Sequence, residues 1–309
     1  MTTTQGIEVT GLSRAFGSVH AVRDASFTAH PGAVTALIGP NGSGKTTLML
    51  MLASLLRPDS GTIRIGGFDP LTETASVRAN LGWMPDVLGS WSSLTVRTTL
   101  EITGRMYALD KSAATARASE LIALVGLEGL ADQPTRVLSR GQKQRLSLAR
   151  ALVHDPSVLL LDEPASGLDP AARIDLRNLV RRVAADGKTV LVSSHVLAEL
   201  DEMADTAVYI GDGVTASDES MAATKTTMRS WRIKAADVAA LESALVGAGI
   251  AHSSVTRDRA ELLVPVAGET AAAELLAALV QRGIAISTFA PAVGDLEHTF
   301  LDLSKGSNR

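Results

Sequence analysis

Apolar residues along the first 220 positions follow two periods, one typical of strands and one typical of helices. Continuous apolar runs, which indicate strands buried on both faces, lie at residues 33–38, 158–161 and 189–192. Alternating apolar positions, which indicate a half-buried antiparallel layer, lie at residues 7–9, 19–27 and 61–65. Helical spacing with start or stop signals lies at residues 48–56, 95–107, 114–125 and 138–153. The pattern predicts an α/β domain with an antiparallel β layer and a helical insert at about residues 86–155.

The pattern changes at about Thr224, where an internal repeat of strand, helix and strand begins. Its two copies of strand, helix and Gly-Ile-Ala step lie at residues 231–233, 237–246 and 249–251, and at residues 262–266, 269–281 and 283–285. The order β-α-β-β-α-β is ferredoxin-like. We therefore expect two domains, residues 1–220 and 221–309. The second is predicted to be a ferredoxin-like α+β accessory domain for dimerisation or regulation.

The stretch GPNGSGKTT, residues 39–47, lies between a predicted strand and a predicted helix. It fits G-x-x-x-x-G-K-[ST], a loop whose backbone N–H groups surround phosphate, whose lysine reaches the β and γ phosphates and whose hydroxyl holds Mg²⁺. A glycine-rich turn that binds nothing would explain the glycines but not the lysine, the hydroxyl and both flanking elements. We predict a P-loop NTPase core whose phosphate-binding residues are Asn41, Gly42, Ser43, Gly44, Lys45, Thr46 and Thr47.

Acidic residues follow the second apolar strand, and a histidine follows the third. Open parallel sheets bind ligands at the carboxyl ends of their strands, so Asp162, Glu163 and His195 are expected at one edge with the P-loop. Asp162 would hold Mg²⁺, Glu163 would orient or deprotonate the attacking water, and His195 would donate a hydrogen bond to the γ phosphate. The alternative for the two acids is an ordinary solvated turn.

Two further features have ordinary structural explanations. Phe16 precedes the P-loop in the antiparallel layer, and its ring could stack on a base or simply be a core or turn phenylalanine. Ser139 and Gln142 fit the helix-capping pattern S-x-x-Q. The same helix start, with the backbone of Gly141 beside it, is also suited to bind an anion.

Composition narrows the class of protein without naming a substrate. The chain has 309 residues, 46% hydrophobic, a net charge of -4 and no cysteine. These values exclude disulfides and cysteine metal sites and give no overall basic field for nucleic acid. The N-terminus MTTTQGIE lacks signal-peptide features, and the longest apolar candidate, residues 46–56, is too short to span a membrane.

These motifs, in this order and spacing, resemble the nucleotide-binding subunit of ATP-binding cassette (ABC) transporters over roughly residues 5–217. The motifs are the Walker A loop at 39–47, the signature LSRGQ at 138–142, the Walker B segment at 158–164, the D-loop SGLD at 166–169 and the switch histidine His195. The signature is the most specific, because other P-loop enzymes lack it. The resemblance implies an ATPase that uses ATP and Mg²⁺.

The resemblance also assigns roles that the residues alone leave open. It implies a head-to-tail dimer with a second copy, in which Ser139, Gly141 and Gln142 of one subunit close over ATP held by Lys45 of the other. Phe16 becomes the expected adenine-stacking residue, and Asp169 of the D-loop joins the nucleotide site. Thr46, Asp86 and Asp162 become the expected metal-binding residues.

Two positions depart from the family's usual pattern. Asp86 stands where glutamine is usual, and Arg140 stands where glycine is usual. Both changes resemble the branch that exports drugs, antibiotics and lipids through separately encoded permeases. A terminal helix expected at residues 295–304 resembles the same branch.

The resemblance implies a partner permease, so we expect the chain in the cytoplasm, held at the inner face of the membrane by that permease. The loop after Asp86 carries Val87, Leu88 and Trp91, which either fold inward or receive a short permease helix. One alternative function is an ABC-type ATPase that acts on nucleic acid or ribosomes. It is disfavoured because the chain has a single cassette and no long coiled coil before the signature. The other alternative, an ATP-binding switch without turnover, is disfavoured by Glu163 and His195.

Overall fold

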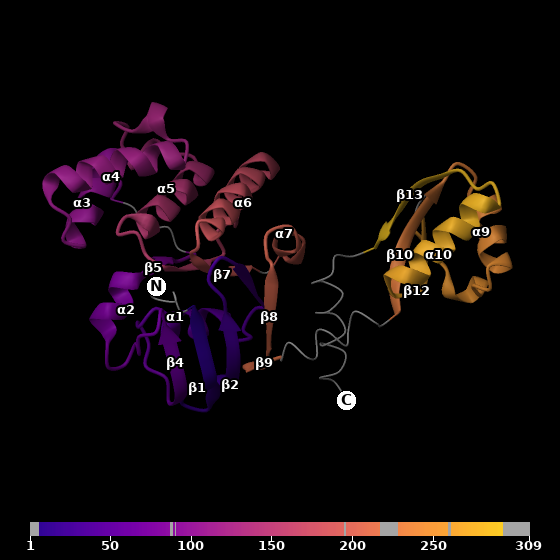
Figure 1. Cartoon of the computed structure of the whole chain (residues 1–309), viewed down its shortest axis with the longest axis horizontal. Coiled ribbons are helices and arrows are strands. Elements are labelled where there is room, and N and C mark those ends of the chain that lie inside the picture. The colour runs from indigo at the N-terminus through magenta and orange to yellow at the C-terminus, as the bar shows by residue number, and fades with distance from the viewer. Residues whose placement is uncertain are drawn as a thin grey trace. The chain divides into compact units, whose positions relative to one another are not determined.

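The computed structural model describes residues 6–86, 89, 91–194, 196–216, 228–258 and 261–292. The chain divides into two compact units, Met1–Ser217 and Asp218–Arg309, and each is described by itself (Figure 1). The predicted terminal helix at 295–304 lies outside the described residues.

The first unit is built on a nine-stranded sheet with the order β4-β1-β2-β9-β8-β3-β7-β6-β5. Its parallel part consists of β3 (Val34–Ile38), β5 (Leu81–Met84), β6 (Val158–Asp162), β7 (Thr189–Ser194) and β8 (Thr206–Gly211). Its other strands are β1 (Ile7–Phe16), β2 (Val19–Ala29), β4 (Ser60–Ile65) and β9 (Val214–Thr215). Strand β1 pairs antiparallel with β2 and β4, which confirms the predicted antiparallel layer.

Helix α1 (Lys45–Leu52) packs between the two kinds of strand. Its residues Leu48, Met49 and Met51 share one buried core with Ile7 of β1 and with residues of β3, β6 and β7. Strands β3, β6 and β7 are buried at every position, as expected for strands covered on both faces. This packing fixes the start of α1 beside the carboxyl ends of β6 and β7.

The remaining helices of this unit include a group inserted between β5 and β6. Figure 1 shows α3, α4 and α5 gathered together on the side away from β1, β2 and β4. The α-helices are α2 (Thr74–Asn80), α3 (Val96–Met106), α4 (Lys111–Leu124), α5 (Arg140–Leu152), α6 (Pro170–Ala185) and α7 (Leu197–Asp201). Short 3₁₀ turns are η1 (Glu128–Leu130) and η2 (Thr135–Val137). At the start of α3, the side chain of Thr95 caps the helix by accepting a hydrogen bond from Thr98 N.

The second unit has a four-stranded antiparallel sheet with the order β11-β12-β10-β13. Its elements are β10 (Met228–Ala235), α9 (Val238–Gly247), η3 (His252–Ser254), β11 (Thr256–Asp258), β12 (Glu261–Ala267), α10 (Gly268–Gln281) and β13 (Ile286–Pro291). The strand-helix-strand repeat expected from the sequence is therefore present twice. Its core contains Trp231, Ile233, Leu241 and Leu279.

Candidate functional site

The loop after β3 takes its shape from two glycines that no larger residue could replace. A Cβ at Gly39 would lie 2.3 Å from Ile210 O, and a Cβ at Gly44 would lie 2.2 Å from Ala21 O. Gly44 also has φ of 104° and caps α1 without a side-chain hydrogen bond. No side chain of the cap residue accepts hydrogen bonds from the first N–H groups of α1. These groups can therefore donate to a bound anion.

Lys45 curls back across this loop. Its Nζ donates to Gly39 O at 2.7 Å and to Pro40 O at 3.1 Å, and the residue is only 7% exposed. Burial lowers the pKa of Lys45, and the nearby charges of Glu163 and Asp162 oppose that shift. A bound phosphate would stabilise the charged form of this buried ammonium group.

Asp162, the last residue of β6, and the backbone of Glu163 after it both contact Ser193 on the neighbouring strand β7. Ser193 Oγ donates to Asp162 Oδ1 at 2.5 Å and accepts from Glu163 N at 3.2 Å. Burial raises the pKa of Asp162, and the charges of Glu163 and Asp86 raise it further, whereas the Ser193 hydrogen bond and Lys45 lower it. Glu163 has φ of 48°, a left-handed conformation that side chains rarely adopt.

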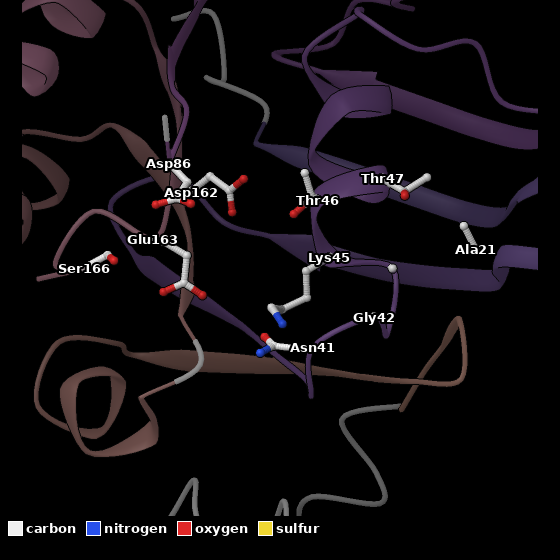
Figure 2. A pocket seen from close by; sticks show the side chains of 11 residues that line it. Ala21, Asn41, Gly42, Lys45, Thr46, Thr47, Asp86, Asp162, Glu163 and Ser166 are labelled. Carbon is white, nitrogen blue, oxygen red and sulfur yellow. The ribbon is translucent and has the colours of Figure 1, made fainter. Parts of the chain in front are cut away.

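These groups line one cavity of about 390 Å³. Figure 2 shows Lys45 and Thr46 on one side of this space and Asp86, Asp162 and Glu163 across from them. The complete lining is Ala21, Asn41, Gly42, Gly44, Lys45, Thr46, Thr47, Asp86, Asp162, Glu163 and Ser166. Three motifs distant in sequence thus meet at the carboxyl ends of the parallel strands, where such sheets bind ligands.

The oxygen atoms that line the cavity suit a divalent cation that is bound together with a phosphate ligand. The described part of the chain contains no group of three or more His, Cys, Asp or Glu side chains arranged to hold a metal. One hydroxyl and a few carboxylates facing a phosphate loop are the donor set with which Mg²⁺ joins a nucleotide. The residues therefore fit Mg²⁺ bound with phosphates and do not form a metal cage of their own.

Some lining residues were not predicted from the sequence. Ala21 and Ser166 line the cavity, and Ser193 holds both acids from behind. Ser193 could have been found from its place two residues before His195 at a strand end, whereas Ala21 carries no chemical signal. Ser43, predicted to contact phosphate, is buried at 4% exposure and does not line the cavity, and its Oγ has no partner among the described residues.

The residues of the signature do not reach this cavity within their own chain. Ser139 caps α5 in a complete capping box, accepting from Gln142 N at 3.3 Å while Ser139 N donates to Gln142 Oε1 at 2.8 Å. Asp169 caps α6 by accepting from Ala172 N at 2.9 Å. Ser139, Gly141, Gln142 and Asp169 are all absent from the cavity lining.

Phe16 ends β1 and is 49% exposed, with the guanidinium of Arg14 4.9 Å from the centre of its ring. It does not line the cavity described above. His195, Val87 and Leu88 lie outside the described residues.

Comparisons with known proteins agree with this geometry. A family model described as ABC transporter matches residues 22–166. The daunorubicin resistance ATP-binding protein DrrA3 of Streptomyces coeruleorubidus is 33% identical over 98% of this chain and 97% of its own length. The ABC transporter ATP-binding protein NatA of Bacillus subtilis is 35% identical over 67% of this chain and 86% of its own length.

Solved structures show the same architecture for the first unit. An ATP-binding subunit of an ABC transporter aligns with a TM-score of 0.63 at 26% identity, over 70% of this chain and 92% of its own. A dimeric cassette in a post-hydrolysis state with ADP and phosphate has the same fold, with a TM-score of 0.62 at 24% identity over 68% of this chain and 97% of its own. The chain therefore belongs to the ABC transporter family, in which it is an ATP-binding and ATP-hydrolysing subunit.

Proposed function

We propose that this chain hydrolyses Mg²⁺-bound ATP in the described cavity and that two copies pair head to tail to complete each other's sites. The observation that carries the proposal is the meeting of Lys45, Thr46, Asp162 and Glu163 around one cavity that the signature of the same chain does not reach. A second copy could supply Ser139 and Gly141. The dimeric state of the solved cassette is a property of that protein and serves here only as an example of the fold.

Each polar residue of the cavity has a role in this proposal. The P-loop backbone and Lys45 bind the phosphates, and Thr46 and Asp162 hold Mg²⁺, with Asp86 beside them. A Mg²⁺ ion held there would supply positive charge that offsets the negative charge developing on the phosphates. Glu163 accepts a proton from the attacking water, and Ser193 fixes the Glu163 backbone for that role.

The test is phosphate release by the purified chain. Glu163→Gln should keep ATP binding and lower kcat by at least about a hundredfold, because the cradle stays intact while the proton acceptor is lost. Lys45→Ala should instead lose affinity for ATP in an equilibrium titration. A turnover rate of Glu163→Gln close to that of the unchanged chain would reject Glu163 as the base.

The surroundings of Trp91 in the first unit are a candidate surface for contact with a permease. Trp91 is 42% exposed, with the Arg150 guanidinium 5.5 Å from the centre of its ring. The ring of Tyr107 stacks on the ring of His154, with 3.8 Å between the ring centres. Met106, the residue before Tyr107, is 71% exposed. Exposed aromatic and methionine side chains are suited to receive an amphipathic helix. We propose that a short cytoplasmic helix of the permease binds here.

We propose that the chain drives export through a separate permease. The names of two relatives describe daunorubicin resistance and Nod factor export. Within the described residues, no helix is both long and apolar enough to cross a lipid bilayer. In this proposal the chain lies in the cytoplasm, held at the inner membrane face by its permease.

We propose that residues 221–309 form a ferredoxin-like accessory domain for dimerisation or regulation, and that residues 1–220 form the ATPase domain with its helical subdomain at about 86–155. The strand order β11-β12-β10-β13 with two helices supports the ferredoxin-like assignment. The alignment with the daunorubicin resistance relative covers 98% of this chain, whereas the alignment with NatA covers only 67% of it.

A further inference from the structure

Arg140 links the start of α5 to the loop that follows β6. Its Nε donates to Ser166 O at 2.7 Å, and its Nη2 donates to Ser166 Oγ at 3.2 Å. The guanidinium thus binds both oxygens of one residue. This two-point geometry suits the planar arginine fork better than the point charge of a lysine.

Gly167 makes room for this contact. It has φ of 69°, and a Cβ there would lie 2.5 Å from Arg140 Nε and 2.8 Å from Arg140 Cζ. The guanidinium therefore lies close against the backbone of the loop. Arg140 and Gly167 fit each other, since a side chain at position 167 would displace the arginine.

Ser166 also contacts the backbone of Glu163, the proposed base. Ser166 N donates to Glu163 O at 3.1 Å, and Ser166 itself lines the nucleotide cavity beside Glu163 (Figure 2). The backbone of Glu163 is in the left-handed region, so it depends on its neighbours to stay there. Hydrogen bonds therefore run from Arg140 through Ser166 to the peptide that carries the proposed base.

Arg140 also lies next to a residue that is proposed to act across the dimer interface. It is the first residue of α5, directly after Ser139, which in the proposed dimer clamps the ATP of the other subunit. Ser166 lines the cavity that is proposed to bind ATP in the same subunit. A contact between Arg140 and Ser166 therefore joins the two half-sites that one chain contributes to the dimer.

We propose that Arg140 is a positioning residue that sets the backbone of Glu163 through Ser166 and couples each chain's clamp to the loop beside its own ATP. The proposal rests on the proposed ATPase function. Arg140 is exposed, so its hydrogen bonds contribute little to stability, and their effect is expected in the rate.

The experiment is a double-mutant cycle of Arg140→Gly and Gly167→Ala in the full chain, with kcat, KM for ATP, Hill coefficient and melting temperature measured for each variant. Arg140→Gly should lower kcat about tenfold, because small misplacements of catalytic groups are costly. The Hill coefficient should fall toward one. ATP affinity, measured in the Glu163→Gln background, should change less than about twofold, since no phosphate-binding group is altered.

Gly167→Ala should lower kcat to a similar extent by displacing Arg140, and the double variant should be no slower than Arg140→Gly alone. Backbone strain from alanine at position 167 would lower the melting temperature both in the unchanged chain and in Arg140→Gly. The melting temperature therefore distinguishes strain from the loss of the Arg140 contact. Arg140→Lys should recover only part of the rate. Arg136→Ala, which removes an exposed cation just before the signature, is the control and should leave kcat unchanged.

An unchanged kcat in Arg140→Gly, or losses of the two single variants that multiply in the double variant, would overturn the proposal. The unchanged chain and Glu163→Gln are measured in parallel. If the unchanged chain hydrolyses ATP, Glu163→Gln does not and Arg140→Gly is normal, the proposed function stands and only the role of Arg140 fails.

Discussion

The buried carboxylate of Asp162 is expected to destabilise the fold, although the proposed Mg²⁺ site requires it. Its carboxyl is buried, and two more carboxylates share its cavity, so the pKa of Asp162 is raised. The folded state therefore favours the protonated form, and ionisation near neutral pH costs free energy of folding. A bound Mg²⁺ would remove that cost.

Asp162→Asn should therefore melt at a higher temperature than the unchanged chain at about pH 8 without ligands, and this gain should be lost below about pH 3, where the unfolded carboxyl is also mostly protonated. Asparagine keeps an oxygen that can accept from Ser193 Oγ. Thermal denaturation across pH checks this, with Mg²⁺-dependent ATPase activity as the second readout. A lower melting temperature at about pH 8 would show that the interaction with Lys45 outweighs burial.

At the scale of single residues, the motifs identify the chemically reactive side chains but not the residues that hold them in place. Lys45, Thr46, Asp162 and Glu163 could be found from their spacing, and the structure brings them to one cavity. Ser193 could be noticed from its position at a strand end, but its hydrogen-bond partners could not be predicted, because they depend on the register of β6 against β7, in which Asp162 is paired with Ser193.

At the scale of elements, the start of α5 allows the packing of the chain itself to be distinguished from the proposed contact with a second copy. A Cβ at Gly141 would lie 3.5 Å from Ala172 Cβ and 3.6 Å from Leu168 Cδ2, which is ordinary contact. The packing of the chain itself therefore leaves room for alanine at this helical position.

Gly141→Ala should stabilise the isolated chain by up to about 1 kcal/mol, because alanine favours helix more than glycine does. It should nevertheless lower ATPase activity, since the added methyl group would lie between the clamp and the partner's ATP. Chemical denaturation and phosphate release measure the two effects. Normal activity in a stabilised variant would contradict a role for Gly141 across the dimer.

The loop before α3, which contains Trp91, gives a second test. Trp91→Ala should weaken co-purification with the permease at a cost of about 2 kcal/mol if Trp91 is a binding hot spot. The isolated subunit should keep its melting temperature, because Trp91 is 42% exposed. Met106→Ala, also on the exposed surface, is the companion variant. Reduced stability with unimpaired co-purification would reject the docking role.

Element boundaries were predictable where a local signal exists and not where tertiary contacts decide. The helix expected at residues 48–56 instead begins at Lys45 and ends at Leu52, because Ser54 adopts φ of 56° and the last N–H groups turn back to Leu50 O and Met51 O. Val19, expected to face inward, is 64% exposed. Register shifts between β1 and β2 place Val22 and Ala25 inside.

At the scale of the whole molecule, the fold of each unit followed from periodicity, and the contact between Arg140 and Ser166 did not. The repeat after Thr224 predicted the order of the strands and helices in the second unit, which the structure contains. The hydrogen bonds of Arg140 depend on how α5 and the loop after β6 pack together. No spacing in the sequence encodes that distance.

The central claim is that ATP joins two copies of the chain through Ser139 and the P-loop. The most direct measurement is light scattering of Glu163→Gln with and without Mg²⁺-ATP, compared with the Glu163→Gln, Ser139→Arg double variant. We expect ATP to raise the mass of the single variant to about twice the 32.2 kDa of one chain and to leave the double variant monomeric, although the latter still binds ATP. An ATP-induced dimer that persists in the double variant, or no ATP-induced dimer in Glu163→Gln, would contradict the account.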